Sequence, residues 1–237
     1  MKLNAMIALS MIVAGSVNAA VTVQLADKTL RFADNPYLAT VLTEAGYNQY
    51  SYWPEAKLFS RDTLNRNQPV LQRTLTTLET LSTKAPELQG FYRYLAQSTY
   101  AFRVPLRLDI DLARIEAKAN PRFDPGDYVL QLGGRSGRVT VTGAVARAAD
   151  YELIAGKTVA DYIQMAKPLA LADNSNAWLI TPDANKQRLG VAYWNNQQTL
   201  PGSGAVIYVP FGTGVPARQL TQLNNDVLQL LINRIEL

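Results

Sequence analysis

Two arginines and two aspartates alternate with apolar residues in one stretch of the chain, and they are its strongest chemical signal. One face of a strand here would carry Val104, Leu106, Leu108, Ile110 and Leu112, and the other Arg103, Arg107, Asp109 and Asp111. An arginine fork matches a carboxylate with two hydrogen bonds. We therefore predict a pocket for a carboxylated ligand on this polar face, with Arg103 enclosed and satisfied by carboxylate or backbone oxygens. The alternative is an exposed strand face whose charges pair with each other.

The spacing of Asp109 and Asp111 allows a second interpretation. Two residues apart on one strand face, their carboxyl groups would lie about 6.5–7 Å apart, close to the separation in inverting glycosidases. Charged strands often contain such a pair, and catalysis would also need a sugar cleft and one acid with a raised pKa. A hydrolase that uses Asp109 and Asp111 is therefore an alternative.

An aromatic cluster of Tyr47, Tyr50, Tyr52 and Trp53 precedes this stretch in the sequence. Such rings can stack on sugar faces, but they also wedge helices onto sheets, and packing is the favoured interpretation. Of the four, Trp53 is the candidate pocket residue, beside Arg103, Arg107 and Asp109.

The composition excludes most other chemistry. The 237 residues include no cysteine and no histidine, which removes the Ser-His-Asp triad, thiolate nucleophiles and the usual transition-metal sites. Clustered acidic pairs that would indicate calcium are also missing, so we expect no metal and no cofactor. The net charge of +4 is small and dispersed, which argues against nucleic-acid binding.

The first 19 residues are typical of a secretory signal peptide. Lys2 is followed by an apolar run from Ala5 to Ala14 and by small residues that end at Ala19, where we expect cleavage. The apolar run is too short for a membrane anchor, and no later stretch is apolar enough to span a bilayer. The sequence therefore predicts an exported protein, located in the periplasm, with a net charge of +3 once Lys2 is removed.

The remaining chain is predicted to contain two small domains with the same order of strands and helix. Residues 20–135 begin with two strands (21–25 and 29–32) and a helix capped by Asn35, and they end with strands at 104–112 and 128–132. Residues 136–215 repeat the order, with strands at 138–146 and 151–155, a helix opened by the capping box Thr158–Asp161, and strands at 177–181, 189–194 and 205–209. A glycine-rich turn at 133–138 would join the two units. The predicted class is α+β, with two tandem β-grasp (ubiquitin-like) domains.

Two further helical segments do not belong to this plan. The region of about 53–102 contains two apolar stripes separated near Pro86, which predicts an inserted helical hairpin whose faces are buried against the second domain. Pro69 would either start the first of these helices or kink a longer one from Ser60. Residues 216–237 predict an amphipathic helix, with Asn224, Asp226, Gln229 and Asn233 outside its apolar face.

The order of these segments resembles the GfcC family of periplasmic capsule-biosynthesis proteins. The resemblance covers essentially the whole chain after residue 19 and rests on these segments: Tyr52-Trp53-Pro54, 102–109, Gly126-Asp127-Tyr128, 138–146, 156–163, Ile180-Thr181-Pro182-Asp183, Ala192-Tyr193-Trp194-Asn195, 200–209 and Leu223-Asn224-Asn225. It implies tandem β-grasp domains, an inserted hairpin, a C-terminal amphipathic helix, and a central pocket lined by the arginine that matches Arg103. Phe102 departs from the pattern, because a glycine is expected before Arg103.

In function, the resemblance implies a non-enzymatic accessory protein in the assembly or export of capsular or extracellular polysaccharide. Its partners would be polysaccharide or the export machinery at the outer membrane, and the protein itself would be a monomer. The domain order also resembles that of the outer-membrane capsule exporter Wza. An oligomeric pore component is therefore a second alternative to the accessory protein, beside the hydrolase. Asparagines and Asp226 in the last helix, which would be costly in hydrocarbon, argue against the pore.

Overall fold

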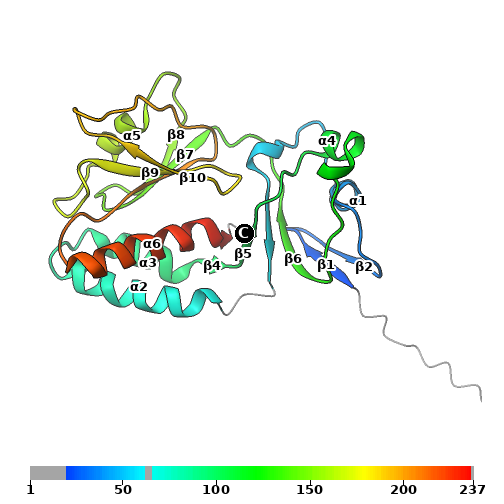
Figure 1. The fold of residues 1–237 in the computed structure, drawn as a ribbon, viewed down its shortest axis with the longest axis horizontal. Helices are drawn as coiled ribbons and strands as arrows, with labels where there is room; N and C mark the ends of the chain where they lie inside the picture. Colours follow the sequence, from blue (N-terminus) through cyan, green and yellow to red (C-terminus); the bar gives the residue numbers. More distant parts are fainter. Residues whose placement is uncertain (1–19, 62–65, 236–237) are drawn as a thin grey trace, which may run out of the picture.

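The computed structural model describes residues 20–61 and 66–235. It contains two five-stranded sheets and a layer of three helices that lies below the second sheet (Figure 1). The expected signal peptide and the last two residues of the expected C-terminal helix lie outside the described residues.

The strands are β1 (Val21–Gln24), β2 (Thr29–Phe32), β3 (Lys57–Ser60), β4 (Thr99–Tyr100), β5 (Phe102–Val104), β6 (Gly126–Gln131), β7 (Arg138–Gly143), β8 (Ala149–Glu152), β9 (Asn176–Ile180), β10 (Lys186–Gly190), β11 (Val206–Val209) and β12 (Arg234–Ile235). The helices are α1 (Leu38–Glu44), α2 (Asn67–Ser82), α3 (Leu88–Gln97), α4 (Ile110–Ile115), α5 (Val159–Ala166) and α6 (Ala217–Asn233). Short 3₁₀ turns occur at Trp53–Glu55 and Ala117–Ala119.

The first sheet has the strand order β2-β1-β6-β3-β5, with β1 and β6 parallel and the other pairs antiparallel. Helices α1 and α4 share its apolar core. The predicted β1–β2 hairpin, helix α1 and strand β6 are therefore present. Asn35 does not cap α1, because the helix begins two residues later than expected and Tyr37 occupies the cap position. Gly46, with a φ of 86°, follows the helix end as predicted.

The expected strand at 104–112 is wrong. Only Phe102–Val104 pairs with a neighbour, and α4 begins at Ile110. The physical reason lies in two residues. Pro105 has no N–H for a strand ladder, and the Asp109 carboxylate accepts a hydrogen bond from the backbone N of Leu112 at 3.1 Å, which caps a helix instead. The apolar alternation is thus divided between a strand end, a turn and a helix.

The second sheet has the order β10-β9-β11-β7-β8, again with one parallel pair, β7 with β11. Helix α5 packs on these two strands. Its capping box is formed as predicted, because Asp161 N donates to Thr158 Oγ1 at 3.2 Å and Thr158 N donates to Asp161 at 2.8 Å. Most expected strands are present with shifted ends, and the glycine-rich turn joins β6 to β7.

The inserted helical hairpin is also present, as α2 and α3, and it packs where the sequence predicted. Leu78, Leu88 and Phe91 belong to one apolar core with the second sheet, α5 and α6, although the hairpin lies between β3 and β5 of the first sheet. Pro69 lies in the first turn of α2. Ser60, however, lies in β3 and not in a helix, and the strand β3 was missed by the sequence analysis.

A short two-stranded sheet joins the exit of the hairpin to the residues that follow α6. Arg234 pairs with Tyr100, and Ile235 pairs with Thr99, in the antiparallel β4–β12 ladder. Ala101 N also donates to the backbone O of Asn233 at 2.9 Å. The last described residues are therefore hydrogen-bonded to the segment that leads from the hairpin into β5.

Candidate functional site

Arg103 lies in the middle of β5 and is buried, with 5% of its surface exposed. It stands opposite Phe59 of β3, and its guanidinium carbon lies 5.1 Å from the Phe59 ring centroid. Nη2 donates to the backbone O of Ala56 at 3.3 Å and also to the backbone O of Pro182. The prediction that Arg103 is enclosed and bound by oxygens is confirmed, and the carbonyls of Ala56 and Pro182 are two of these oxygens.

These contacts make Arg103 a link between the two halves of the molecule. Ala56 precedes β3 of the first sheet, whereas Pro182 lies in the turn after β9 of the second. The backbone N of Arg103 also donates to the Asn233 Oδ1 at 3.0 Å, at the end of α6. Separation of these elements would leave a buried cation with fewer hydrogen bonds, which is costly.

Two hollows border Arg103, and both carry positive charge. A small one of about 30 Å³ includes Lys57 and Arg234, and a wide, open one of about 470 Å³ includes Lys186, Asn225 and Gln229. No aspartate or glutamate of the described part of the chain lines either hollow. A hollow bordered by several cationic side chains has a positive potential that attracts an anionic ligand.

The other three predicted site residues form a separate group on the surface of the first sheet. The Arg107 guanidinium lies 4.2 Å from the Trp53 ring centroid and donates to Asp109 Oδ2 at 2.8 Å. Arg107 is more than half exposed. The structure therefore brings Trp53, Arg107 and Asp109 together as one group.

The carboxylate pair of the hydrolase hypothesis is not arranged on a strand face. Asp109 caps α4 and pairs with Arg107. Asp111 lies in the first turn of α4 with 89% of its side chain exposed and its carboxylate 3.9 Å from Arg114. Both acids therefore interact with groups of α4. The strand on which the glycosidase spacing was based is not present at these residues.

The aromatic cluster is divided between packing and exposure. Tyr47 packs against the first core, and burial, followed by the negative charges of Asp109 and Asp111, raises its pKa. Tyr52 faces Arg135, with 5.9 Å between the ring centroid and the guanidinium carbon, whereas Tyr50 is 79% exposed. The favoured packing role therefore fits Tyr47, whereas the Tyr52 ring contacts an arginine and Tyr50 is exposed.

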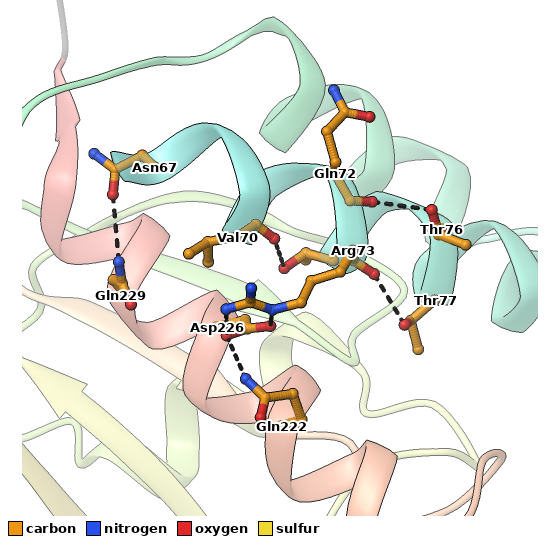
Figure 2. A network of polar contacts seen from close by, with 10 residues as sticks. Asn67, Val70, Gln72, Arg73, Thr76, Thr77, Gln222, Asp226 and Gln229 are labelled. Atoms are coloured by element: carbon orange, nitrogen blue, oxygen red, sulfur yellow. Dashed lines mark hydrogen bonds and ion pairs between the residues drawn. The ribbon is translucent and has the colours of Figure 1, made fainter. Parts of the chain in front are cut away.

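Sequence reasoning missed a polar network between α2 and α6. Figure 2 shows Arg73 reaching from α2 to Asp226 of α6, with nitrogen–oxygen distances of 2.6 and 2.9 Å, while Gln222 donates to the same carboxylate at 2.8 Å. Asp226 is buried, with 3% exposed. Near the ends of the same helices, Asn233 Nδ2 donates to Asn67 Oδ1 at 3.1 Å. One signal in the sequence could have indicated this network. Asp226 directly precedes Val227, which belongs to the apolar face of α6.

In the described residues, no group of three or more acidic side chains could hold a metal ion. No helix in that part of the chain is long and apolar enough to cross a membrane.

Two family descriptions match this chain in the order of its two sheets. Residues 17–135 match "Capsule biosynthesis GfcC, N-terminal", and residues 147–236 match "Capsule biosynthesis GfcC C-terminal". The chain belongs to the GfcC capsule-biosynthesis family. It is also 30% identical over 190 residues to a protein of Escherichia coli (strain K12) named "Uncharacterized protein YjbG". The matched region covers 78% of this chain and 77% of that protein. Membership of this family indicates a role in the assembly of capsule or a related polysaccharide outside the cytoplasm.

Proposed function

We propose that this protein is a periplasmic, non-enzymatic accessory factor in the assembly or export of capsular or extracellular polysaccharide. The observation that carries the proposal is the match of both halves of the chain to one capsule-biosynthesis family. The signal-like residues 1–19 support export to the periplasm. Its partners are polysaccharide or the export machinery at the outer membrane, and the free protein is a monomer.

The fold assignment within this proposal is that each sheet is a β-grasp unit, with residues 20–135 and 136–215 as the two domains. Three shared features support it. Each sheet has a hairpin (β1–β2 and β7–β8), a helix directly after that hairpin (α1 and α5), and a parallel pair between the first hairpin strand and a later strand (β6 and β11).

Arg103 and its cationic surroundings are the proposed contact for acidic groups of the polysaccharide. Lys186 and Arg103 border the open hollow of about 470 Å³, which has room for one sugar ring or more. Arg103 is already bonded to carbonyls on either side of the junction between the two sheets. An anion bound there would therefore compete with these bonds and alter the contacts at the junction.

In the part of the chain that the structure describes, the residues on which the two alternatives depend have structural roles. Asp109 and Asp111 are engaged with α4, which gives them a role without catalysis. The apolar face of α6 that a pore would need is occupied in the core, with Leu223, Val227 and Leu228 all buried.

The test is a gene deletion complemented with the wild-type protein and with Arg103→Ala, Arg103→Lys and Arg107→Ala. We expect the deletion to reduce surface polysaccharide, and Arg103→Ala to restore less of it than Arg107→Ala, because Arg107 is an exposed surface residue. Soluble periplasmic abundance is measured for each variant, since loss of Arg103 also loosens the junction. Equal, mild effects of both alanine substitutions would reduce Arg103 to an ordinary arginine.

A second measurement addresses the non-enzymatic claim. The purified protein is incubated with the polysaccharide, and new reducing ends are counted. We expect none above background, and turnover that disappears in Asp109→Asn would overturn this part of the proposal.

A further inference from the structure

Two large aromatic side chains on the loop between β10 and β11 are largely exposed to solvent. Tyr193 is 101% exposed and Trp194 is 75% exposed. Exposed apolar area of this kind weakens solubility without stabilising the fold, and where it is presented in an ordered way it indicates a contact surface. We call the pair Tyr193–Trp194 the aromatic turn.

The aromatic turn is held in place by the residues on either side of it. Asn195 N donates to Ala192 O at 3.0 Å, so Tyr193 and Trp194 occupy the two central positions of a β-turn. The Asn195 side chain accepts a hydrogen bond from Ala192 N at 2.9 Å and donates to Ser175 O at 3.0 Å. A side chain at Gly190 would collide with the backbone of Asn195, so the glycine permits this close approach.

The chain segment that carries the aromatic turn is neutral and rich in amides, although Asp173 and Arg188 form an ion pair at 4.0 Å near it. No charged residue occurs between Arg188 and Arg218, and the turn is followed by Asn195, Asn196, Gln197 and Gln198. Gln197 and Gln198 are exposed. Each free amide offers two donors and an acceptor, which match the hydroxyl groups of a sugar.

A small hollow lies beside the turn and adds further polar groups. It measures about 40 Å³ and is bordered by Val191 next to the turn, by Gln164 of α5, and by Asp173 and Asn174. A space of this size holds a water molecule or a hydroxyl group.

We infer that the aromatic turn is a carbohydrate-binding platform on which the neutral sugar rings of the polysaccharide stack. The C–H groups on one face of a pyranose ring are electropositive and are attracted to the negative face of an aromatic ring, while the neighbouring amides bind the hydroxyls. The inference rests on the proposed function, and it adds a second contact to the cationic region around Arg103. A membrane surface is disfavoured, because interfacial segments combine aromatic residues with lysine or arginine, which this stretch lacks.

Intrinsic fluorescence offers a direct test, because the chain has three tryptophans and Trp194 is the exposed one among them. The probe is a set of short oligosaccharides released by partial acid hydrolysis from the polysaccharide of the host strain. We expect saturable binding that shields the fluorescence from acrylamide, weakened by about tenfold in Tyr193→Ala and lost from the fluorescence signal in Trp194→Ala. Calorimetry supplies the affinity for Trp194→Ala, and we expect a loss of about tenfold there too.

Tyr50→Ala is the matched control, because Tyr50 is a similarly exposed aromatic residue outside the turn. Its affinity is expected to equal that of the wild type, and the melting temperatures of all three variants should be unchanged because the removed side chains contact solvent. Wild-type affinity in both turn variants would overturn the platform.

Two further outcomes would also overturn the inference. One is binding to vesicles of phosphatidylcholine and phosphatidylglycerol that depends on Trp194, which would indicate a membrane contact. The other is an export defect of the turn variants without any oligosaccharide binding by the wild type, which would indicate a protein partner. The proposed function fails separately, if deletion of the gene leaves surface polysaccharide unchanged while the purified protein still binds the oligosaccharides.

Discussion

At the scale of single residues, buried polar side chains define how the parts of this molecule meet. Arg103 joins the first sheet to the turn after β9, Asp226 joins α6 to α2, and Asn233 joins α6 to both β5 and α2. Apolar contacts tolerate small rotations, whereas hydrogen bonds with fixed geometry do not. The relative orientation of the elements therefore depends on a few polar residues.

The Arg73–Asp226 pair leads to the first residue-scale prediction. Arg73→Ala should lower the free energy of unfolding by about 1–3 kcal/mol, because it leaves a buried carboxylate with fewer partners. Asp226→Asn should have a smaller effect, since Arg73 is half exposed and can return to water. Urea unfolding measures both, with Arg218→Ala as an exposed control in the same helix. A larger effect of Asp226→Asn than of Arg73→Ala would contradict this asymmetry.

Buried tyrosines lead to a prediction about alkaline pH. Burial raises the pKa of Tyr100 and of Tyr208 above the ordinary value of 10.0. Below pH 10 these phenols are neutral in both the folded and unfolded states, but above it only the unfolded chain loses the protons, so stability must fall as pH rises. Urea midpoints between pH 8 and 11 should show this decline, and Tyr208→Phe should make it shallower. A midpoint that does not change across this range would contradict the prediction.

At the scale of elements, the inserted hairpin serves the second sheet and not the sheet that contains it in sequence. Leu78, Leu88 and Leu95 are fully buried in the second core. The hairpin leaves the first sheet after β3, and the chain returns to that sheet at β5, after β4 has paired with β12. In this way, one insertion connects the two sheets through a shared apolar core.

Leu88 tests this role at the start of α3. Leu88→Ala should lower the free energy of unfolding by about 2–5 kcal/mol, because it leaves a cavity in a fully buried site. Gln89→Ala, at the exposed neighbouring position, should change it by less than about 0.5 kcal/mol. Chemical denaturation followed by fluorescence should also show one transition. Two separated transitions in the wild type would mean that the sheets unfold independently and that the hairpin does not couple them.

Much of the element order was predictable from local signals. The capping box at Thr158, the turn at Gly46 and the two apolar stripes of the hairpin each depend on residues near one another in sequence. Strand β3 was missed, because four residues with Leu58 and Phe59 buried together show no alternation. Its pairing with β5 crosses the whole hairpin, so local patterns do not contain it. The partners of Arg103 were unpredictable for the same reason, since Ala56 and Pro182 are distant in sequence.

At the scale of the whole molecule, the C-terminal helix α6 is an internal element. Its apolar face lies in the core with α2 and the second sheet, and Figure 1 shows it between that sheet and α2. Tyr208 of β11 donates to Asn224 of this helix at 2.8 Å. A surface that is already covered in this way is not available for assembly between copies.

We therefore expect the protein to remain a monomer in solution and in detergent. Light scattering of the protein without residues 1–19 should give the mass of one chain in buffer and, after subtraction of the micelle, in a mild detergent. Leu220→Glu, at a half-buried position of α6, serves as a comparison that weakens docking of the helix. A stable ring of wild-type chains that forms only in detergent would contradict the docked helix and support a pore.

The β4–β12 ladder has a consequence for the order in which the chain folds. A chain that leaves a ribosome or a translocation channel emerges with its N-terminus first. The first sheet has all of its strands once residue 131 has emerged, but the second core needs α6, and the exit of the hairpin needs Arg234 and Ile235. The apolar faces of α2 and α3 therefore cannot be fully buried until more than 100 further residues have emerged. Over that interval the nascent chain is exposed to aggregation and proteolysis. Loss of only the few residues of β12 should be more harmful than their small number suggests, because they pair with the exit of the hairpin.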